Sequence, residues 1–178
     1  MDAVHPVVCT ERLRLRLVTE ADAPFFLRLV NDPAFVEHIG QRNLHDLPAA
    51  RAALRDGPIA MQARYGHSLY LVEALDGGAP LGLSGLVKRE FLEHVDIGYA
   101  FLPEARGQGY ALEAARGVMA HARTLGITCL AAFTSPANAA SIALLLRLGM
   151  RFERLAVLVP DQPAVNVYLT DLAPARDG

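Results

Sequence analysis

The chain has few of the residues that would indicate a disulfide-stabilised, nucleic-acid-binding or membrane protein. It contains two cysteines, Cys9 and Cys129, no tryptophan and a single lysine, Lys88. Two cysteines cannot form a disulfide framework or a cysteine-rich metal cluster, so buried thiols in a reducing cytosol are expected. The net charge of -2 gives no electrostatic reason to expect nucleic acid or an anionic membrane as a partner.

Long apolar runs and metal-ligand patterns are missing as well. No stretch is long enough to span a bilayer, and the first six residues lack the basic and then apolar segments of a signal peptide. The six histidines show no metal-ligand spacing, and no HExxH motif occurs. The sequence therefore predicts a cytoplasmic protein that needs no metal and binds neither a membrane nor, directly, nucleic acid.

Ordinary globular composition and clear periodicities predict one α/β domain. The 178 residues are 52% apolar and 20% charged, and they contain no internal repeat or low-complexity linker. We expect a domain over residues 8–172 and a disordered tail over residues 173–178. The predicted strands cover residues 12–17, 68–74, 81–88, 95–102, 128–134, 151–159 and 164–170. The predicted helices cover residues 20–30, 47–64 with a break at residues 57–58, 107–125 and 138–149.

A glycine-containing loop, residues 106–111, opens the longest uninterrupted predicted helix. A helix N-terminus presents unpaired N–H groups that suit a phosphate, and Gly107 and Gly109 allow close approach to the backbone. Arg106 adds a positive charge, and Ala111 is small. The three spaced glycines of a dinucleotide fold and the Gly-Lys-Ser/Thr of a P-loop are both absent. The loop alone predicts an anion site, although glycine pairs before helices are common in α/β proteins.

Residues 96–114 resemble the cofactor motif of the GNAT superfamily of N-acetyltransferases. The family pattern Arg/Gln-x-x-Gly-x-Gly/Ala is filled by Arg106, Gly109 and Ala111. Residues 138–152 resemble the next family motif, Asn-x-x-Ser followed by an apolar helix and Leu-Gly-Phe. Residues 10–22 resemble the opening of the branch that includes the RimJ/RimL ribosomal-protein acetyltransferases. The resemblance covers nearly the whole chain.

This resemblance implies a single α/β domain with a mixed, mostly antiparallel sheet of about seven strands flanked by helices. A splayed pair of strands would hold acetyl-CoA, with strand backbone on the pantetheine arm, loop amides on the pyrophosphate and an N–H near Phe101 on the thioester carbonyl. The residues expected to bind the cofactor are Tyr99, Ala100, Phe101, Arg106, Gly107, Gln108, Gly109, Tyr110, Ala111, Leu112, Asn138 and Ser141.

The resemblance also implies catalytic roles. Ser141 matches a proposed proton donor to the leaving thiolate, with a solvent-facing serine as the alternative. Asp96 stands where members often carry a base, with a surface acid at a strand start as the alternative. Asn138 is a good helix cap by its residue type alone. Leu145 occupies the place of the tyrosine that many members use as general acid, so that acid is missing here.

The acceptor is expected to be a primary amine, favouring the N-terminal α-amine of a protein or peptide. Roughly a quarter of an α-amine is already neutral at cytosolic pH, whereas about a thousandth of a lysine amine is. The α-amine therefore needs less help from a base, and no strong base is evident in the sequence. Transfer to a small-molecule amine and a non-catalytic acyl-CoA sensor are the alternatives, and a homodimer is the expected assembly.

Overall fold

The protein is built on one open, eight-stranded sheet. Its structure, a computed structural model, describes residues 6–173. The strands follow the order β1-β2-β3-β4-β5-β6-β8-β7, and the only parallel pair among these described strands is β5 with β6. Their bounds are β1 Val8–Cys9, β2 Leu13–Leu17, β3 Leu69–Ala74, β4 Pro80–Val87, β5 Asp96–Phe101, β6 Cys129–Thr134, β7 Arg151–Ala156 and β8 Val165–Asp171. The predicted mixed, mostly antiparallel sheet is confirmed, with eight strands because the two-residue β1 was too short to be predicted from a pattern.

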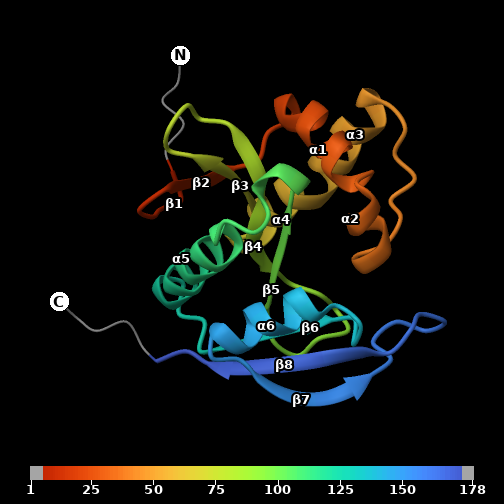
Figure 1. Ribbon diagram of the computed structural model, residues 1–178, viewed down its shortest axis with the longest axis vertical. Coiled ribbons are helices and arrows are strands. Elements are labelled where there is room, and N and C mark those ends of the chain that lie inside the picture. The colour runs from red at the N-terminus through yellow and green to blue at the C-terminus, as the bar shows by residue number, and fades with distance from the viewer. Residues whose placement is uncertain (1–5, 174–178) are drawn as a thin grey trace.

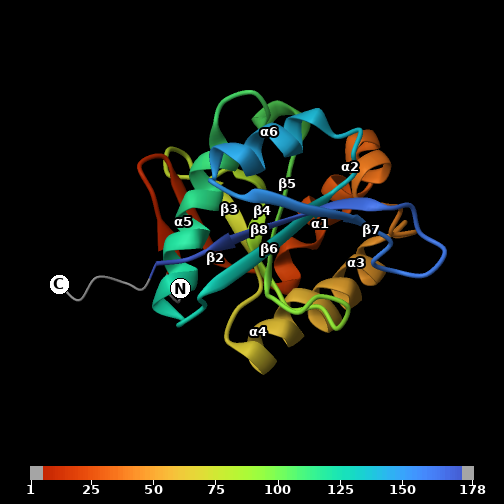
Figure 2. The ribbon, with the colours of Figure 1, turned by 90° about the horizontal axis from the view of Figure 1, so that it is seen from below.

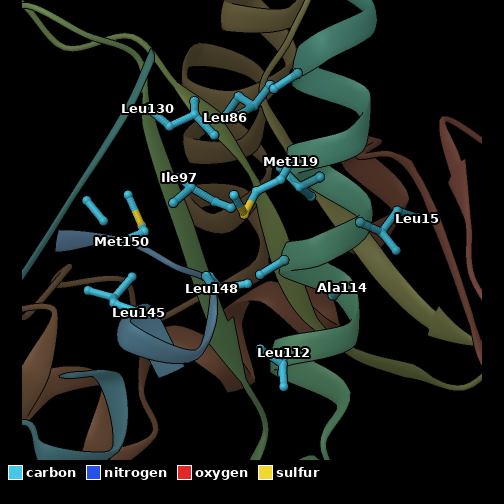
Figure 3. Close-up of a cluster of buried hydrophobic side chains, with 14 of the residues drawn as sticks. Leu15, Leu86, Ile97, Leu112, Ala114, Met119, Leu130, Leu145, Leu148 and Met150 are labelled. Atoms are coloured by element: carbon cyan, nitrogen blue, oxygen red, sulfur yellow. The ribbon is translucent and has the colours of Figure 1, made fainter. Parts of the chain in front are cut away.

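Helices cover both faces of this sheet (Figures 1 and 2). Their bounds are η1 Glu20–Asp22, α1 Ala23–Val30, α2 Pro33–His38, α3 Leu47–Leu54, η2 Arg55–Ile59, α4 Ala60–Tyr65, η3 Pro103–Ala105, α5 Tyr110–Thr124 and α6 Ala139–Arg147. One apolar core lies between the sheet, α5 and α6, where Ile97 and Met119 point toward one another (Figure 3). A second core lies on the opposite face, under α1, α2 and α3.

The parallel pair β5–β6 is splayed. The two strands pair at one register position, Asp96 with Ala131, and the Ala131 amide donates to the carbonyl of Val95 at 2.9 Å. Figure 1 shows β5 running away from the lower part of the sheet, where β8 and β7 lie. Beyond Asp96 and Ala131 the backbone of β5 therefore has no strand opposite it on that side.

Three helix predictions were wrong in detail. Pro33 begins α2 instead of only ending α1, because proline fits the first turn of a helix, where its missing N–H is not needed. Asp32 caps that turn by accepting a hydrogen bond from the Phe35 amide at 3.2 Å. The break expected at residues 57–58 does not occur, because a π-helical turn, η2, carries the chain past Pro58 from α3 into α4. The helix expected from residue 107 starts at Tyr110, because Gly107 and Gly109 have φ of 73° and 80°.

Within residues 6–173, no helix has the length and apolar character that crossing a membrane requires. The same residues contain no group of three or more His, Cys, Asp or Glu side chains placed to hold a metal ion. The predicted tail lies outside the described residues, apart from Ala173.

Candidate active site

The loop between β5 and α5 carries a run of free backbone donors. The Arg106 amide before the run donates to the Pro103 carbonyl at 3.2 Å, and the Glu113 amide after it donates to the Gly109 carbonyl at 3.1 Å. Between them, none of the six amides of residues 107–112 has an acceptor within residues 6–173. Six successive free amides at the N-terminus of a 15-residue helix form a concentrated site for an anion.

Glycine is required at two positions of this loop. Gly107 and Gly109 both have left-handed φ values, which residues with a Cβ rarely adopt. At Gly109 a Cβ would also lie 3.4 Å from the guanidinium of Arg12. The sequence predicted these glycines because they let a ligand approach the backbone closely. The structure adds a second reason, since the turn itself requires the left-handed φ that glycine adopts readily.

The splayed strands β5 and β6 leave a gap between them. The edge of β5 that faces this gap offers further backbone groups. The Leu102 amide donates to the Leu81 carbonyl at 2.9 Å, which fixes the alternation of hydrogen-bonded pairs between β4 and β5. By this alternation the N–H and C=O groups of Tyr99 and Phe101 point away from β4, toward the gap. Those of Ala100 point toward β4. Three strand residues were expected to offer their backbone to the cofactor arm. Tyr99 and Phe101 direct their backbone groups toward the gap, and Ala100 does not.

Arg106 lies at the mouth of the loop, but its guanidinium is already paired. It donates to the Phe101 carbonyl at 3.0 Å and to the Asp32 carboxylate at 2.5 Å. Burial of Asp32 opposes ionisation, yet the hydrogen bonds from Arg106 and from backbone amides leave the pKa of Asp32 below its usual range. In this structure Arg106 joins the end of β5 to the α1–α2 junction, a contact between residues 74 positions apart.

Arg12 is a site residue that sequence reasoning missed. Its guanidinium donates to the Gln108 carbonyl at 3.0 Å, forms an ion pair with Glu113 at 2.6 Å and lies 4.6 Å from the centre of the Tyr110 ring. Thr10 donates to the same Glu113 carboxylate at 2.6 Å. By bonding the Gln108 carbonyl, Arg12 fixes the orientation of the Gln108–Gly109 peptide, whose N–H points the opposite way, as in any trans peptide. Arg12 was hidden in the alternating run of residues 12–17, which indicates only a strand.

Across the gap, the structure brings together two predicted site residues. The hydroxyls of Tyr99 on β5 and Ser141 on α6 are hydrogen-bonded at 2.7 Å. Burial raises the pKa of Tyr99, and the hydrogen bond with Ser141 works against that shift. The Tyr99 phenol therefore stays protonated at neutral pH and can donate a proton. The sequence predicted only a backbone role for Tyr99.

Asn138 and Leu145 fix the position of Ser141 on its helix. The Asn138 side chain caps α6 by accepting a hydrogen bond from the Ser141 amide at 3.1 Å, as its residue type predicted. Leu145, one turn beyond Ser141, is 1% exposed and lies in the core between α5 and α6. No acid can therefore act from position 145.

Asp96 lies where β5 and β6 meet. It is 2% exposed and bonds the Arg89 guanidinium at 2.8 Å. Burial raises the pKa of its carboxyl to about 6, although the charge and hydrogen bond of Arg89 pull in the other direction. The surface-acid alternative is wrong: Asp96 is a buried carboxylate at the closed end of the gap.

The geometry thus combines anion-binding amides, an unpaired strand edge, a hydroxyl pair and a buried carboxylate along one gap. These parts suit a long ligand that carries phosphates at one end and a reactive group at the other. The free strand backbone can hold an extended arm, and the hydroxyl pair can protonate a leaving group.

Comparisons with known proteins agree with this arrangement. Residues 12–151 match the acetyltransferase (GNAT) domain family. The Bacillus subtilis protein YkkB is 32% identical over 151 residues, which cover 82% of this chain and 85% of that protein. An acetyltransferase structure from Agrobacterium tumefaciens is 26% identical, covers 96% of both chains and superimposes with a TM-score of 0.79.

RimL, a ribosomal L7/L12 alpha-N-protein acetyltransferase solved in complex with coenzyme A, has a TM-score of 0.80. It covers 94% of this chain and 98% of its own, but at 20% identity it shows likeness of fold alone. The family match spans most of the residues that build the gap, including the loop, β5 and α6. The chain belongs to the GNAT family of acetyltransferases.

Proposed function

We propose that this acetyltransferase transfers the acetyl group of acetyl-CoA directly to the N-terminal α-amine of a protein or peptide. The observation that carries the proposal is the run of six free amides over residues 107–112. GNAT domains use acetyl-CoA, whose pyrophosphate is the anion that these amides would bind. The backbone N–H and C=O of Tyr99 and the N–H of Phe101 would then hold the pantetheine arm, since the Phe101 carbonyl already accepts from Arg106.

The hydroxyl pair supports a role in releasing coenzyme A. Acetyl-CoA supplies a thioester, and the amine nitrogen forms its bond to the carbonyl carbon as the carbon–sulfur bond breaks. An N–H of β5 near Phe101 stabilises the charge on the carbonyl oxygen. Ser141 donates a proton to the departing thiolate, and the half-buried, protonated Tyr99 phenol replaces it through their 2.7 Å hydrogen bond. Tyr99 then takes a proton back from solvent.

The chemistry of the base supports an α-amine acceptor. Asp96 is 2% exposed and holds Arg89, so it can accept a proton only through a short relay. An α-amine with a pKa of about 7.7–8.0 loses its proton readily near neutral pH, whereas a lysine amine of about 10.4 does not. The family likeness to an enzyme named as an alpha-N-protein acetyltransferase points the same way.

The cysteines support transfer without a covalent enzyme intermediate. Burial, together with the negative charges of Asp171, Glu153 and Glu93, raises the pKa of Cys129, which disfavours a reactive thiolate. Cys9 is exposed on β1 and Cys129 is only partly buried, so the expectation of two buried thiols is wrong. Neither thiol is among the residues that build the gap, so the amine itself is the nucleophile.

The test is acetyl-CoA binding by Gly109→Glu, measured by calorimetry. The substitution places a side chain and a negative charge among the free amides, and we expect binding to be lost. Gly126→Glu is the matched control, because Gly126 has a similar φ of 76° at the other end of α5 and open space around it. Unchanged affinity in Gly109→Glu would place the cofactor elsewhere.

Acceptor chemistry is tested separately by coenzyme A release with peptide N-termini, lysine side chains and small amines. We expect peptide α-amines to give the highest kcat/KM. A higher kcat/KM with small-molecule amines would show that the acceptor is a small molecule and not a protein N-terminus. Binding of acetyl-CoA without release of coenzyme A for any amine would favour a sensor.

A further inference from the structure

The end of β5 is held in place by a side chain where a neighbouring strand is missing. The Phe101 carbonyl faces the gap and accepts a hydrogen bond from Nε of Arg106 at 3.0 Å. On the other side of the same peptide, the Leu102 amide donates to the Leu81 carbonyl of β4 at 2.9 Å. The Phe101–Leu102 peptide is therefore held at both ends, and Arg106 supplies one of the two bonds.

Asp32 holds the Arg106 guanidinium from the opposite side of the gap. Its carboxylate accepts a hydrogen bond from Nη2 of Arg106 at 2.5 Å, and its side chain is only 8% exposed. A guanidinium is planar and rigid, so bonds at both Nε and Nη2 fix the plane in which it meets the Phe101 carbonyl. Asp32 thus determines how Arg106 is oriented toward β5, although Asp32 itself lies at the start of α2.

A buried aspartate before a helix often does no more than cap it. Asp46 is such a residue: it accepts the Ala49 amide at the start of α3 at 2.8 Å, and it takes part in none of the ion pairs within residues 6–173. Asp32 also caps its helix, through the Phe35 amide, but it has a second bond that reaches the cofactor loop. Capping alone does not explain that second bond.

We propose that Asp32 is a positioning residue for acetyl transfer, which acts through Arg106 to hold the end of β5 in its productive conformation. This inference rests on the proposed function, because the Phe101 N–H is one of the backbone donors assigned there to acetyl-CoA. Asp32 touches neither substrate in this proposal. Since the six loop amides bind the pyrophosphate without Asp32, its loss should lower the rate of transfer much more than the affinity for the cofactor.

The first test is Asp32→Asn. Asparagine still caps α2 well, but it lacks the charge that holds Arg106. With a peptide α-amine and saturating acetyl-CoA, we expect kcat to fall by about tenfold, because a small misplacement of the reacting groups is enough for such a loss. The Kd for acetyl-CoA, measured by calorimetry, should change by less than about threefold.

Two variants serve as matched controls and should keep the wild-type kcat. Asp46→Asn makes the same change at a helix cap that bonds no arginine. Glu104→Gln removes the Arg28–Glu104 ion pair, which also joins α1 to the segment after β5 but is exposed, with side chains 61% and 52% accessible.

Arg106→Gln tests whether the effect passes through the arginine. If it does, adding Asp32→Asn to Arg106→Gln should change kcat by less than about twofold, because the two residues act along one path. Thermal unfolding gives a second readout. Asp32→Asn should lower the Tm of the wild type but raise that of Arg106→Gln, in which Asp32 is a buried carboxylate without its partner.

Two results would overturn the inference. One is a wild-type kcat in Asp32→Asn, and the other is an equal loss of kcat from Asp32→Asn with and without Arg106, which is what a purely structural role predicts. Failure of the proposed function looks different, because the wild-type protein would then not bind acetyl-CoA or would not acetylate the peptide amine.

Discussion

Asp96 is a single residue whose protonation makes the stability of the fold depend on pH. Its carboxyl has a pKa raised to about 6 by burial, against an unfolded value of about 3.9. The folded protein therefore binds this proton more tightly than the unfolded chain does. The stability that comes from protonated Asp96 is complete below about pH 4 and is lost as the pH rises through about 6.

We expect this loss to be visible when the wild-type protein is compared with Asp96→Asn, which keeps a neutral side chain at every pH. The free energy of unfolding of the wild type relative to the variant should fall between about pH 4 and pH 6, by on the order of 3 kcal/mol. Urea unfolding at several pH values measures it. A difference that stays constant across that range would show that the pKa is not raised.

The Tyr99–Ser141 pair predicts a kinetic effect at the same scale. Ser141→Ala and Tyr99→Phe each remove one hydroxyl of the proposed proton relay, and we expect kcat to fall by about a hundredfold in each. The double variant should be no slower than either single one, because the two hydroxyls act as one unit.

The control for this pair is Tyr168→Phe, which removes a hydroxyl from a buried tyrosine on β8 and should leave kcat unchanged. Steady-state rates with acetyl-CoA at saturation separate kcat from binding. A wild-type kcat in Ser141→Ala would remove Ser141 from the mechanism.

Between elements, Arg12, which directly precedes β2, joins that strand to the cofactor loop and the start of α5. We expect Arg12→Gln to weaken acetyl-CoA binding by about threefold to tenfold, because the Gln108–Gly109 peptide loses the donor that holds it. The effect is modest since Arg12 is 44% exposed.

Arg14→Gln is the matched control for Arg12. Arg14 lies two residues further along the chain, on β2, is 38% exposed and pairs with Glu73, away from the loop. Calorimetry of both variants, with thermal unfolding to verify folding, gives the comparison. Equal affinities in the two variants would show that the loop does not depend on Arg12.

The elements also show what the sequence could and could not predict. Alternation and capping residues predicted most strands and helices, because these signals are local. The glycine pair predicted the anion loop for the same reason. The short strand β1 and the helix that begins at Pro33 gave no pattern of sufficient length. The π-helical turn at Pro58 keeps the chain helical where the Gly57-Pro58 pair predicts a break.

The site contacts that were missed join distant parts of the chain. Arg12 and Glu113 are 101 residues apart, Arg106 and Asp32 are 74 apart, and Tyr99 and Ser141 are 42 apart. Each of these residues has an ordinary local interpretation as a strand, loop or helix residue. Only the packing of the elements selects the partner, so no local pattern could predict the pair.

At the scale of the whole molecule, the sheet ends in an apolar edge. Strand β7 is the last strand, and Phe152 and Leu155 on it are 55% and 58% exposed. Exposed apolar edges favour pairing with another chain, and in a two-fold dimer the same surface of each copy would be covered. The homodimer stays a prediction, and β7 is the surface that we expect it to bury.

The contacts that hold the loop make its geometry depend on a distant part of the chain. All the glycines of the loop lie within a few residues, but Arg12, which orients one of its peptides, is synthesised about a hundred residues earlier. The full affinity for acetyl-CoA that we propose therefore depends on the residues just before β2 being packed against the start of α5. A ligand that binds only this finished state stabilises it by about 2.7 kcal/mol at a hundred times its Kd. Shortening the N-terminus through Arg12 would thus lower the affinity while leaving every residue of the glycine motif in place.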